Sequence, residues 1–328
     1  MSDKLEILKM IENGKITVEE GLQMIEALEQ TEKIEDDIRE EIYSRVDTDR
    51  EHIDSEIYGY ESTKSDVLKD FDVSLTTCKL NIERSNVEDV MVEILDARTR
   101  ELVTQPEWLH IVEEKNTIMI KESRVTNLSD ILDFFKSGAA AQNHIYINIK
   151  VPMETVIDKG KFTSVSGSLS VIGLKAVDLE VKSVSGKIYA VDVKTKIVQL
   201  KSTSGAVVAD NLKIAKGYLK STSGKVKFTG KASHLECKTV SGTVEVHCAD
   251  HLETLHANSV SGKVSLHIDA PERFNMKLNS VSGNIDTSGF AIVDKSGSGK
   301  KSVNIMNRSD SKLIEATTVS GKIVVDRL

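Results

Sequence analysis

The sequence predicts a mainly β protein, a parallel β-solenoid (β-helix) with coils of about 19 residues, preceded by a small N-terminal αα-hairpin. Three observations predict this fold class. A four-residue motif of the form Ser/Thr-Val/Thr-Ser-Gly returns eight times, and aliphatic residues stand at fixed distances from its glycine. Aromatic residues make up only 4% of the chain, so the core must consist of Val, Ile and Leu. A constant period near 20 residues is the sequence signature of a solenoid.

The first domain, residues 1–32, has the pattern of two short amphipathic helices. Asn13-Gly14 stops the first helix, and Thr17 with Glu20 forms a capping box that starts the second. A hairpin this small cannot bury a core alone, so we expect it to dock on a second copy or on a protein partner; contact with a membrane is the alternative. The candidate docking residues recur at helical spacing and are Leu5, Leu8, Ile11, Leu22, Ile25 and Leu28.

The second domain, residues 33–72, holds 14 acidic and 6 basic residues and is expected to be an acidic, partly helical linker. The third domain, residues 73–328, is expected to be the solenoid. Its first part alternates apolar and polar residues between turn signals, which is typical of strands. We expect these strands near residues 71–83, 90–95, 109–114, 117–122 and 144–152, with an amphipathic patch at 128–138 before the last.

The motif glycines define the coils. Their successive gaps are 19, 19, 19, 18, 20, 21 and 38 residues. Because the last gap is twice 19, it predicts one further coil without the motif before the final glycine. The eight structural-repeat glycines are Gly167, Gly186, Gly205, Gly224, Gly242, Gly262, Gly283 and Gly321.

Three columns of apolar residues are expected to face the core, and in one coil they are Val181, Val184 and Ile188. They lie five before, two before and two after the glycine, so the chain must bend near the first serine of the motif. This phase places Gly186 inside the coil, where a side chain would compete for space, and leaves the serines outward or at the corner. We therefore interpret the motif as a building device and not as a phosphate-binding loop, since no Walker-type Lys-Ser follows it.

Lysines recur at outward positions, and Ser164–Leu328 carries 23 Lys and Arg against 15 Asp and Glu. Such a face could bind a teichoic-acid-like polymer, anionic lipid headgroups or the acidic segment of the same chain; the alternative is a solvated face that blocks edge aggregation. Nucleic acid is not expected as a partner, because aromatics for base stacking are missing. The candidate anion-binding residues are Lys182, Lys187, Lys201, Lys220, Lys225 and Lys238.

No catalytic residue, cofactor or metal ligand is predicted. The stretch HCADHLETLH gathers His and Cys, but Cys237 and Cys248 have inward parity, whereas His247 and His267 face outward and could stack in adjacent coils. The aspartates scatter between columns and do not form the carboxylate cluster that glycan cleavage needs. We expect a non-enzymatic interaction scaffold, with a glycan-binding or glycan-cleaving β-helix as the alternative.

Localisation is predicted from absences in the sequence. Three cysteines without a CxxC spacing are a poor disulfide framework and indicate a reducing compartment. The N-terminus lacks the pattern of a secretory signal, and no apolar run approaches the length of a membrane span. We expect a cytoplasmic protein that could associate with a membrane; surface display stays open.

The residues IYINIKVP at 145–152, followed by iterated S-V-S-G-[KN]-[IV], resemble the bacterial "putative adhesin" β-repeat family. The N-terminal hairpin resembles SHOCT-type modules, whose mark reads here Gly14, Ile16, Thr17, Glu19 and Glu20. Together they are similar to LiaX-like envelope-stress proteins of Gram-positive bacteria. The resemblance implies a non-enzymatic regulator or sensor of envelope damage, with a membrane stress-sensing protein or cationic peptides as partners. It carries over no binding residue, and the long acidic linker departs from it.

Overall fold

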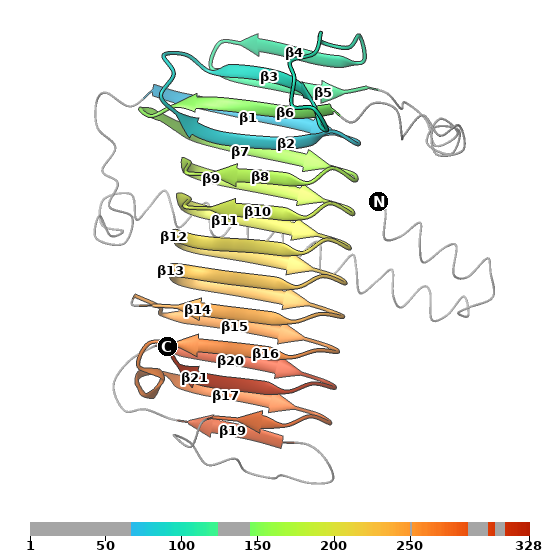
Figure 1. Cartoon of the computed structure of the whole chain (residues 1–328). Helices are drawn as coiled ribbons and strands as arrows, with labels where there is room; N and C mark the ends of the chain where they lie inside the picture. Colours follow the sequence, from blue (N-terminus) through green and yellow to red (C-terminus); the bar gives the residue numbers. More distant parts are fainter. Residues whose placement is uncertain (1–66, 124–144, 250, 288–300, 306–311) are drawn as a thin grey trace, which may run out of the picture. The chain divides into compact units, whose positions relative to one another are not determined.

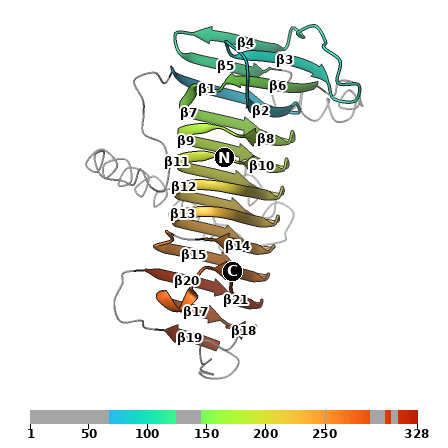
Figure 2. The ribbon, with the colours of Figure 1, turned by 60° about the vertical axis from the view of Figure 1, so that its left-hand side comes forward.

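The computed structural model describes residues 67–123, 145–249, 251–287, 301–305 and 312–328. These residues form a β-solenoid in which each coil contributes one strand to each of two opposing sheets (Figures 1 and 2). The predicted fold class is therefore confirmed for this part of the chain. The predicted hairpin, most of the acidic linker and the patch at 128–138 lie outside the described residues.

One sheet, called sheet A here, contains the strands that lead into the motif. They run parallel, except for β4 and β19 at the two ends. In spatial order the strands of sheet A are β4 (Leu109–Glu114), β5 (Thr117–Glu122), β1 (Val67–Leu75), β7 (Thr155–Ser164), β9 (Lys175–Ser183), β11 (Lys194–Ser202), the second halves of β12 (Val207–Ser221) and β13 (Val226–Thr239), β15 (Thr254–Ser259), β20 (Leu313–Thr318), β17 (Asn275–Ser280) and β19 (Lys301–Ile305).

The other sheet, called sheet B, contains the strands that follow the motif. All are parallel apart from β3. In spatial order they are β3 (Met91–Asp96), β6 (Ile145–Pro152), β2 (Lys79–Ser85), β8 (Leu169–Ile172), β10 (Ile188–Val191), the first halves of β12 and β13, β14 (Val244–Cys248), β16 (Val264–Ile268), β21 (Ile323–Arg327) and β18 (Ile285–Asp286). A single 3-10 turn, η2 (Pro271–Arg273), is described between β16 and β17.

The two terminal coils are intercalated. The C-terminal coil of β20 and β21 lies between the coils of β15–β16 and β17–β18, with which both of its strands pair. In the same way β1 and β2 lie between β5–β6 and β7–β8. The prediction of an unmarked coil between Gly283 and Gly321 is wrong for the described residues, because the strand described in that stretch, β19, runs antiparallel to β17. The coil of Gly321 turns back and packs directly on that of Gly262.

Antiparallel strands cover both ends of the stack. At one end β3 pairs with β6 and β4 pairs with β5, while at the other end β19 pairs with β17. An exposed parallel edge is a template for pairing with another chain, and short antiparallel strands reduce that hazard. The strands predicted at 90–95, 109–114, 117–122 and 144–152 are confirmed as β3, β4, β5 and β6.

The core between the sheets is aliphatic, and two of the three predicted inward columns are confirmed. Residues five before and two after the glycine are buried in every coil; Val181 and Ile188 have no exposed surface. The prediction for the column two before the glycine is wrong, because Val184 is 38% exposed. The other exposed valines of that column, between 45% and 50%, are Val165, Val240, Val260, Val281 and Val319.

The physical reason lies in where the chain bends. The turn follows the first serine of the motif, so Ser183 keeps the inward phase of Val181 and is only 6% exposed, while Val184 turns outward. The buried hydroxyl of Ser183 accepts a hydrogen bond from the Gly186 N–H at 2.8 Å. In the next coil the equivalent Ser202 hydroxyl donates to the Gly186 carbonyl at 3.1 Å. The first serine of the motif therefore lies at the corner, as predicted, but its hydroxyl is buried and bonds backbone groups.

This motif turn is called the first corner, and its glycines pack on one another. A Cβ on Gly205 would lie 2.0 Å from the carbonyl oxygen of Gly186 in the preceding coil, and the other motif glycines meet a backbone oxygen at 1.5 to 2.3 Å. None of the eight has a φ in the left-handed range. Glycine is required here because any side chain would strike the neighbouring backbone, not because of unusual dihedral angles.

The hydrogen bonds of the first corner end on a buried carboxylate. In later coils the corner N–H groups donate to the preceding coil, as Ser185 does to Val165 at 2.8 Å. In the coil of β1 and β2, Glu122 accepts instead from the backbone N–H groups of Thr76 and Thr77 at 2.8 and 2.9 Å, and of Cys78 at 3.2 Å. Although burial raises the pKa of Glu122, these bonds lower it below its ordinary value overall.

The opposite turn, the second corner, leads from sheet B back to sheet A. Four successive coils place a residue with positive φ there: Gly173 (67°), Asp192 (55°), Asn211 (52°) and Gly230 (138°). Gly, Asn and Asp tolerate this left-handed region best. The second corner therefore selects a conformation that several residue types can adopt, and it leaves no repeated motif in the sequence.

Candidate interaction surfaces

Four of the predicted lysines stack in register on sheet A, and we call them the first-corner lysine row. Lys201 pairs with Lys182 on one side and Lys220 on the other, and Lys220 pairs with Lys238. The strand spacing puts successive Cα atoms about 4.8 Å apart. Lys187 and Lys225 lie beyond the first corner, at the start of sheet B, so the corner separates them from this row.

Carboxylates beside the first-corner lysine row offset part of its charge. Lys182 pairs with Glu180 at 2.5 Å, and Lys238 pairs with Glu236. Between them Gln199, with its amide oriented to satisfy both neighbours, donates to Glu180 at 2.7 Å and accepts from Lys201 at 3.2 Å. Of these contacts, the one between Gln199 and Glu180 links neighbouring coils. A ligand must compete with the carboxylates for Lys182 and Lys238.

Sequence reasoning missed a second set of stacked lysines, the second-corner lysine row. Lys194 pairs in register with Lys175 and Lys213, and Lys213 pairs with Lys231. The side chains are half-buried where the chain enters sheet A. The pKa of Lys194 is lowered by burial, and then by the positive charges of Lys213, Lys175 and Arg84. A signal existed in the sequence, since three of these lysines stand eight residues after a motif glycine.

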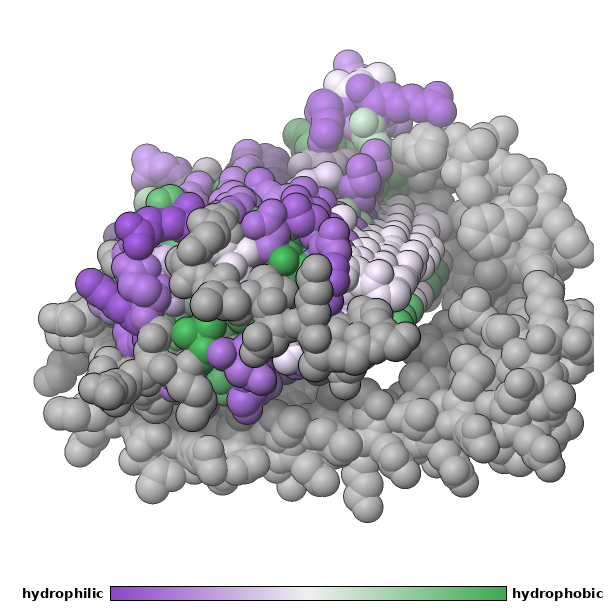
Figure 3. All heavy atoms as spheres, turned by 90° about the horizontal axis from the view of Figure 1, so that it is seen from below, coloured by the Kyte–Doolittle hydropathy of each residue, from purple (hydrophilic) through white to green (hydrophobic). Residues whose placement is uncertain are grey.

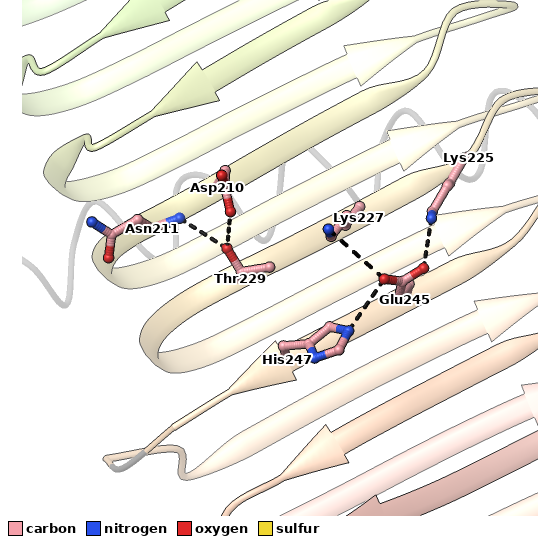
Figure 4. A network of polar contacts seen from close by, with 7 residues as sticks. All are labelled: Asp210, Asn211, Lys225, Lys227, Thr229, Glu245 and His247. Atoms are coloured by element: carbon pink, nitrogen blue, oxygen red, sulfur yellow. Dashed lines mark hydrogen bonds and ion pairs between the residues drawn. The ribbon is translucent and has the colours of Figure 1, made fainter. Parts of the chain in front are cut away.

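Sheet B carries a mixed network of charges and hydrogen bonds (Figure 4). Glu245 contacts Lys225 at 2.5 Å, His247 at 3.2 Å and Lys227 at 3.9 Å. The hydrogen bond from Lys225 is the main cause that lowers the pKa of Glu245. Lys225 is thus occupied by a carboxylate, which weakens its candidacy as an anion-binding residue.

The predicted stacking of two histidines is confirmed. The rings of His247 and His267 lie 4.2 Å apart at an interplanar angle of 17°. Burial, followed by the charge of His247, lowers the pKa of His267, while Asp326 at 3.9 Å opposes this shift. Cys237 and Cys248 are buried as their parity indicated. Within the described ranges, no group of three or more His, Cys, Asp or Glu side chains could hold a metal ion.

The aspartates of the second corner have neutral partners. Asp192 accepts a hydrogen bond from the Asn211 amide at 2.6 Å, and Asp210 accepts one from the Thr229 hydroxyl. Two carboxylates facing one glycosidic bond would be needed for glycan cleavage. These aspartates instead form hydrogen bonds that link neighbouring coils.

Seen along the stack from below, most of the described surface is hydrophilic, and rows of side chains with intermediate hydropathy run along one side (Figure 3). The exposed Val and Ser residues of the first corner are regular along the axis, but each valine stands beside a polar serine. Among the described residues, no helix has the length and apolar character that crossing a membrane requires.

Comparison with known protein families gives two matches. The family described as Toastrack DUF4097 matches residues 68–326, and a SHOCT-like domain matches residues 2–33. The second match confirms the resemblance predicted for the N-terminal segment. Comparison with curated proteins gives no match.

Two solved structures are similar to most of the chain. A "putative lipid binding protein" from Parabacteroides distasonis ATCC 8503 has 14% identity and a TM-score of 0.44, and the similarity covers 79% of this chain and 94% of that one. A "putative cell adhesion protein" from Clostridium sporogenes ATCC 15579 has 13% identity and a TM-score of 0.24, covering 79% and 93%. Neither similarity is high enough to transfer a ligand to this chain.

Proposed function

The chain belongs to the Toastrack DUF4097 family, and we propose that its solenoid is a non-enzymatic scaffold that binds an anionic component of the bacterial cell envelope. The observation that supports this best is the stacking of lysines in register on sheet A, four in each of two rows. A solenoid repeats a side chain at a fixed interval along its axis, which suits a ligand that repeats its charge.

Multivalency gives such a surface its strength. One exposed lysine contributes about 1 kcal/mol to binding an anionic surface, and several that act together add up, because the rigid sheet holds them in place beforehand. The interaction is screened by salt over a Debye length of about 10 Å at 0.1 M. Binding should therefore be clear at low ionic strength and fall steeply as salt is added.

The test uses the full chain at low salt with three probes: vesicles of phosphatidylglycerol and phosphatidylcholine, vesicles of phosphatidylcholine alone, and a soluble phosphate polymer. Binding to at least one anionic probe, with none to the neutral vesicles, supports the proposal. If neither anionic probe binds, or if binding is insensitive to salt, the proposal is wrong.

We further propose that the protein acts as a regulator or sensor in an envelope-stress response, through a protein partner that the N-terminal segment recruits. The support is the joining of a SHOCT-like domain to the solenoid, together with the LiaX-like arrangement that the sequence resembles. Deleting residues 1–32 should change an envelope-stress reporter while anion binding by the solenoid persists. Replacing Ile11 and Ile25 by Asp should have the same effect if the apolar stripe contacts the partner. An unchanged reporter with an unchanged partner pull-down would contradict this role.

A further inference from the structure

We propose that the second-corner lysine row is the principal anion site of the solenoid, and that its ligand is a linear chain of phosphate groups lying along the axis, across the strands. The inference rests on the proposed function for the sign of the ligand's charge. It assigns the binding to residues that the repeated motif does not mark: Lys175, Lys194, Lys213 and Lys231.

The register of the strands gives this site its shape. The four lysines occupy one column of four adjacent coils, so their Cα atoms span about 15 Å along the axis at about 4.8 Å steps. Lysine is a point charge with rotatable donors and a common binder of phosphate. A row of such charges, one side chain wide, fits an extended polyanion whose phosphates repeat along the same line.

Charge compensation differs between the inner lysines of the second-corner row and the outer lysines of the first-corner row. In the first-corner row, Lys182 and Lys238 already pair with Glu180 and Glu236. In the second-corner row, no carboxylate of the described residues forms an ion pair with Lys194 or Lys213, its two inner members. Asp192 and Asp210 accept hydrogen bonds from Asn211 and Thr229 and form no ion pair with these two lysines.

Like charges in adjacent strands repel each other. The lowered pKa of Lys194 has burial as its main cause and the charges of its lysine neighbours and Arg84 as the next. A bound polyanion would relieve this repulsion at Lys194, whereas Lys182 and Lys238 already have Glu180 and Glu236 as partners. The gain from an external anion is therefore larger at Lys194 and Lys213 than at Lys182 and Lys238.

The neighbouring side chains favour a chain-like ligand over a membrane. The row lies at an edge of sheet A, where the coil turns, and the column between it and the first-corner lysine row presents Glu236 and Glu315 outward, while Glu180 of that column is only 8% exposed. A membrane laid flat across sheet A would press Glu236 and Glu315 against anionic headgroups. A linear polymer that follows the edge avoids them.

The experiment compares two variants of the full chain that remove the same charge, K194Q/K213Q and the matched control K182Q/K238Q. The probe is long-chain inorganic polyphosphate, measured by titration at several salt concentrations. K194Q/K213Q should bind about tenfold more weakly or worse, with a salt slope smaller by about 1.4, since about 0.7 is lost per phosphate contact on a flexible strand. The control should change affinity less than about threefold.

Two further measurements test whether the charge of the lysines and the length of the ligand determine binding. K194R/K213R keeps the charges and should keep the binding. With the unchanged protein, long-chain polyphosphate should raise the unfolding temperature, whereas tripolyphosphate at equal phosphate concentration should not, because it cannot span the row.

Four results would overturn the inference. Equal losses in both Gln variants would place the binding on sheet A as a whole, and a loss confined to K182Q/K238Q would place it at the first corner; in either case the proposed scaffold function survives. Binding to anionic vesicles without binding to polyphosphate would make the ligand a membrane surface. If the unchanged protein binds neither probe, the proposed function fails as well.

Discussion

At the first corner of each coil, glycine packs on glycine. At the second corner, the equivalent position of successive coils is occupied by Gly, Asp or Asn. The first corner needs the absence of a side chain, since a Cβ on Gly205 would lie 2.0 Å from a neighbouring carbonyl oxygen. The second corner needs a left-handed backbone, which Asn211 adopts with a φ of 52°. A steric demand admits one residue type, while a conformational demand admits several.

This difference explains which part of the coil is repeated in the sequence. The motif recurs because its serine and glycine are held by contacts that every coil must reproduce, namely the buried Ser183 hydroxyl and the close approach of Gly186 to its neighbour. The second corner is free to vary in sequence, and the lysines beside it can follow the needs of a ligand. The motif therefore marks construction, and recognition is more readily placed outside it.

The largest expected effect is that of a methyl group at the first corner. Gly205→Ala should lower the free energy of unfolding by about 3 kcal/mol or more, because backbone of two coils must separate to admit it. Urea unfolding of the full chain measures the loss. A loss below about 1 kcal/mol would show that the coils are not packed as closely as this account requires.

The second-largest effect is expected at Glu122, the carboxylate on which the hydrogen bonds of the first corner end. Replacing Glu122 by Gln leaves backbone donors of Thr76, Thr77 and Cys78 with a weaker acceptor and should cost about 2 kcal/mol at neutral pH.

The pH dependence of Glu122 follows from its depressed pKa. The folded protein holds this pKa below the ordinary value of 4.5, so the stabilisation is fully present above that pH and is lost as the pH falls through the folded value. The difference in unfolding free energy between the unchanged protein and E122Q should therefore shrink on acidification from about pH 6 to about pH 3. A difference independent of pH would mean that the charge is not what caps the corner.

The stability of the second corner should depend on how easily the residue at position 211 adopts a positive φ. Asn211→Gly and Asn211→Ala both remove the amide that bonds Asp192, but only Ala resists a positive φ. The Ala variant should be less stable than the Gly variant by about 1 kcal/mol, measured by thermal unfolding. Equal stabilities would indicate that Asn211 is chosen for its side-chain bond alone.

The smallest effect is expected at an exposed motif position. Val184→Thr should change the unfolding free energy by less than about 0.5 kcal/mol, because Val184 is 38% exposed and the same column already holds Thr203 and Thr222. The matched substitution Val181→Thr puts a hydroxyl into the core and should cost more than 1 kcal/mol, about the value for an unsatisfied buried polar group. Similar costs at the two positions would contradict the bend assigned to the first corner.

Much of the fold could be predicted from spacing alone. The period, the buried columns of Val181 and Ile188 and the stacking of His247 on His267 follow from counting residues from the glycine. The phase of Val184 could not be obtained in this way, because alternation does not tell on which side of a serine the chain bends. The inserted C-terminal coil was missed since a gap of 38 residues fits an extra coil as well as a returning chain.

The candidate site was predicted less well. The first-corner lysine row lies at a constant distance before the glycine and was found, but the carboxylates of Glu180 and Glu236 that offset it belong to a different column. The second-corner row lies across a turn whose length changes: Lys231 stands seven residues after its glycine, where Lys213 stands eight. Only the register of the strands brings these two lysines together.

The central claim, that the motif builds the solenoid and the second-corner lysine row binds its ligand, is tested most directly by one comparison of polyphosphate affinity. It sets S204A/S223A, which removes two exposed motif hydroxyls, against K194Q/K213Q. The account predicts unchanged affinity for the serine variant and a loss of about tenfold for the lysine variant. Loss of binding in the serine variant, with the lysine variant unaffected, would contradict it and make the repeated motif the recognition surface.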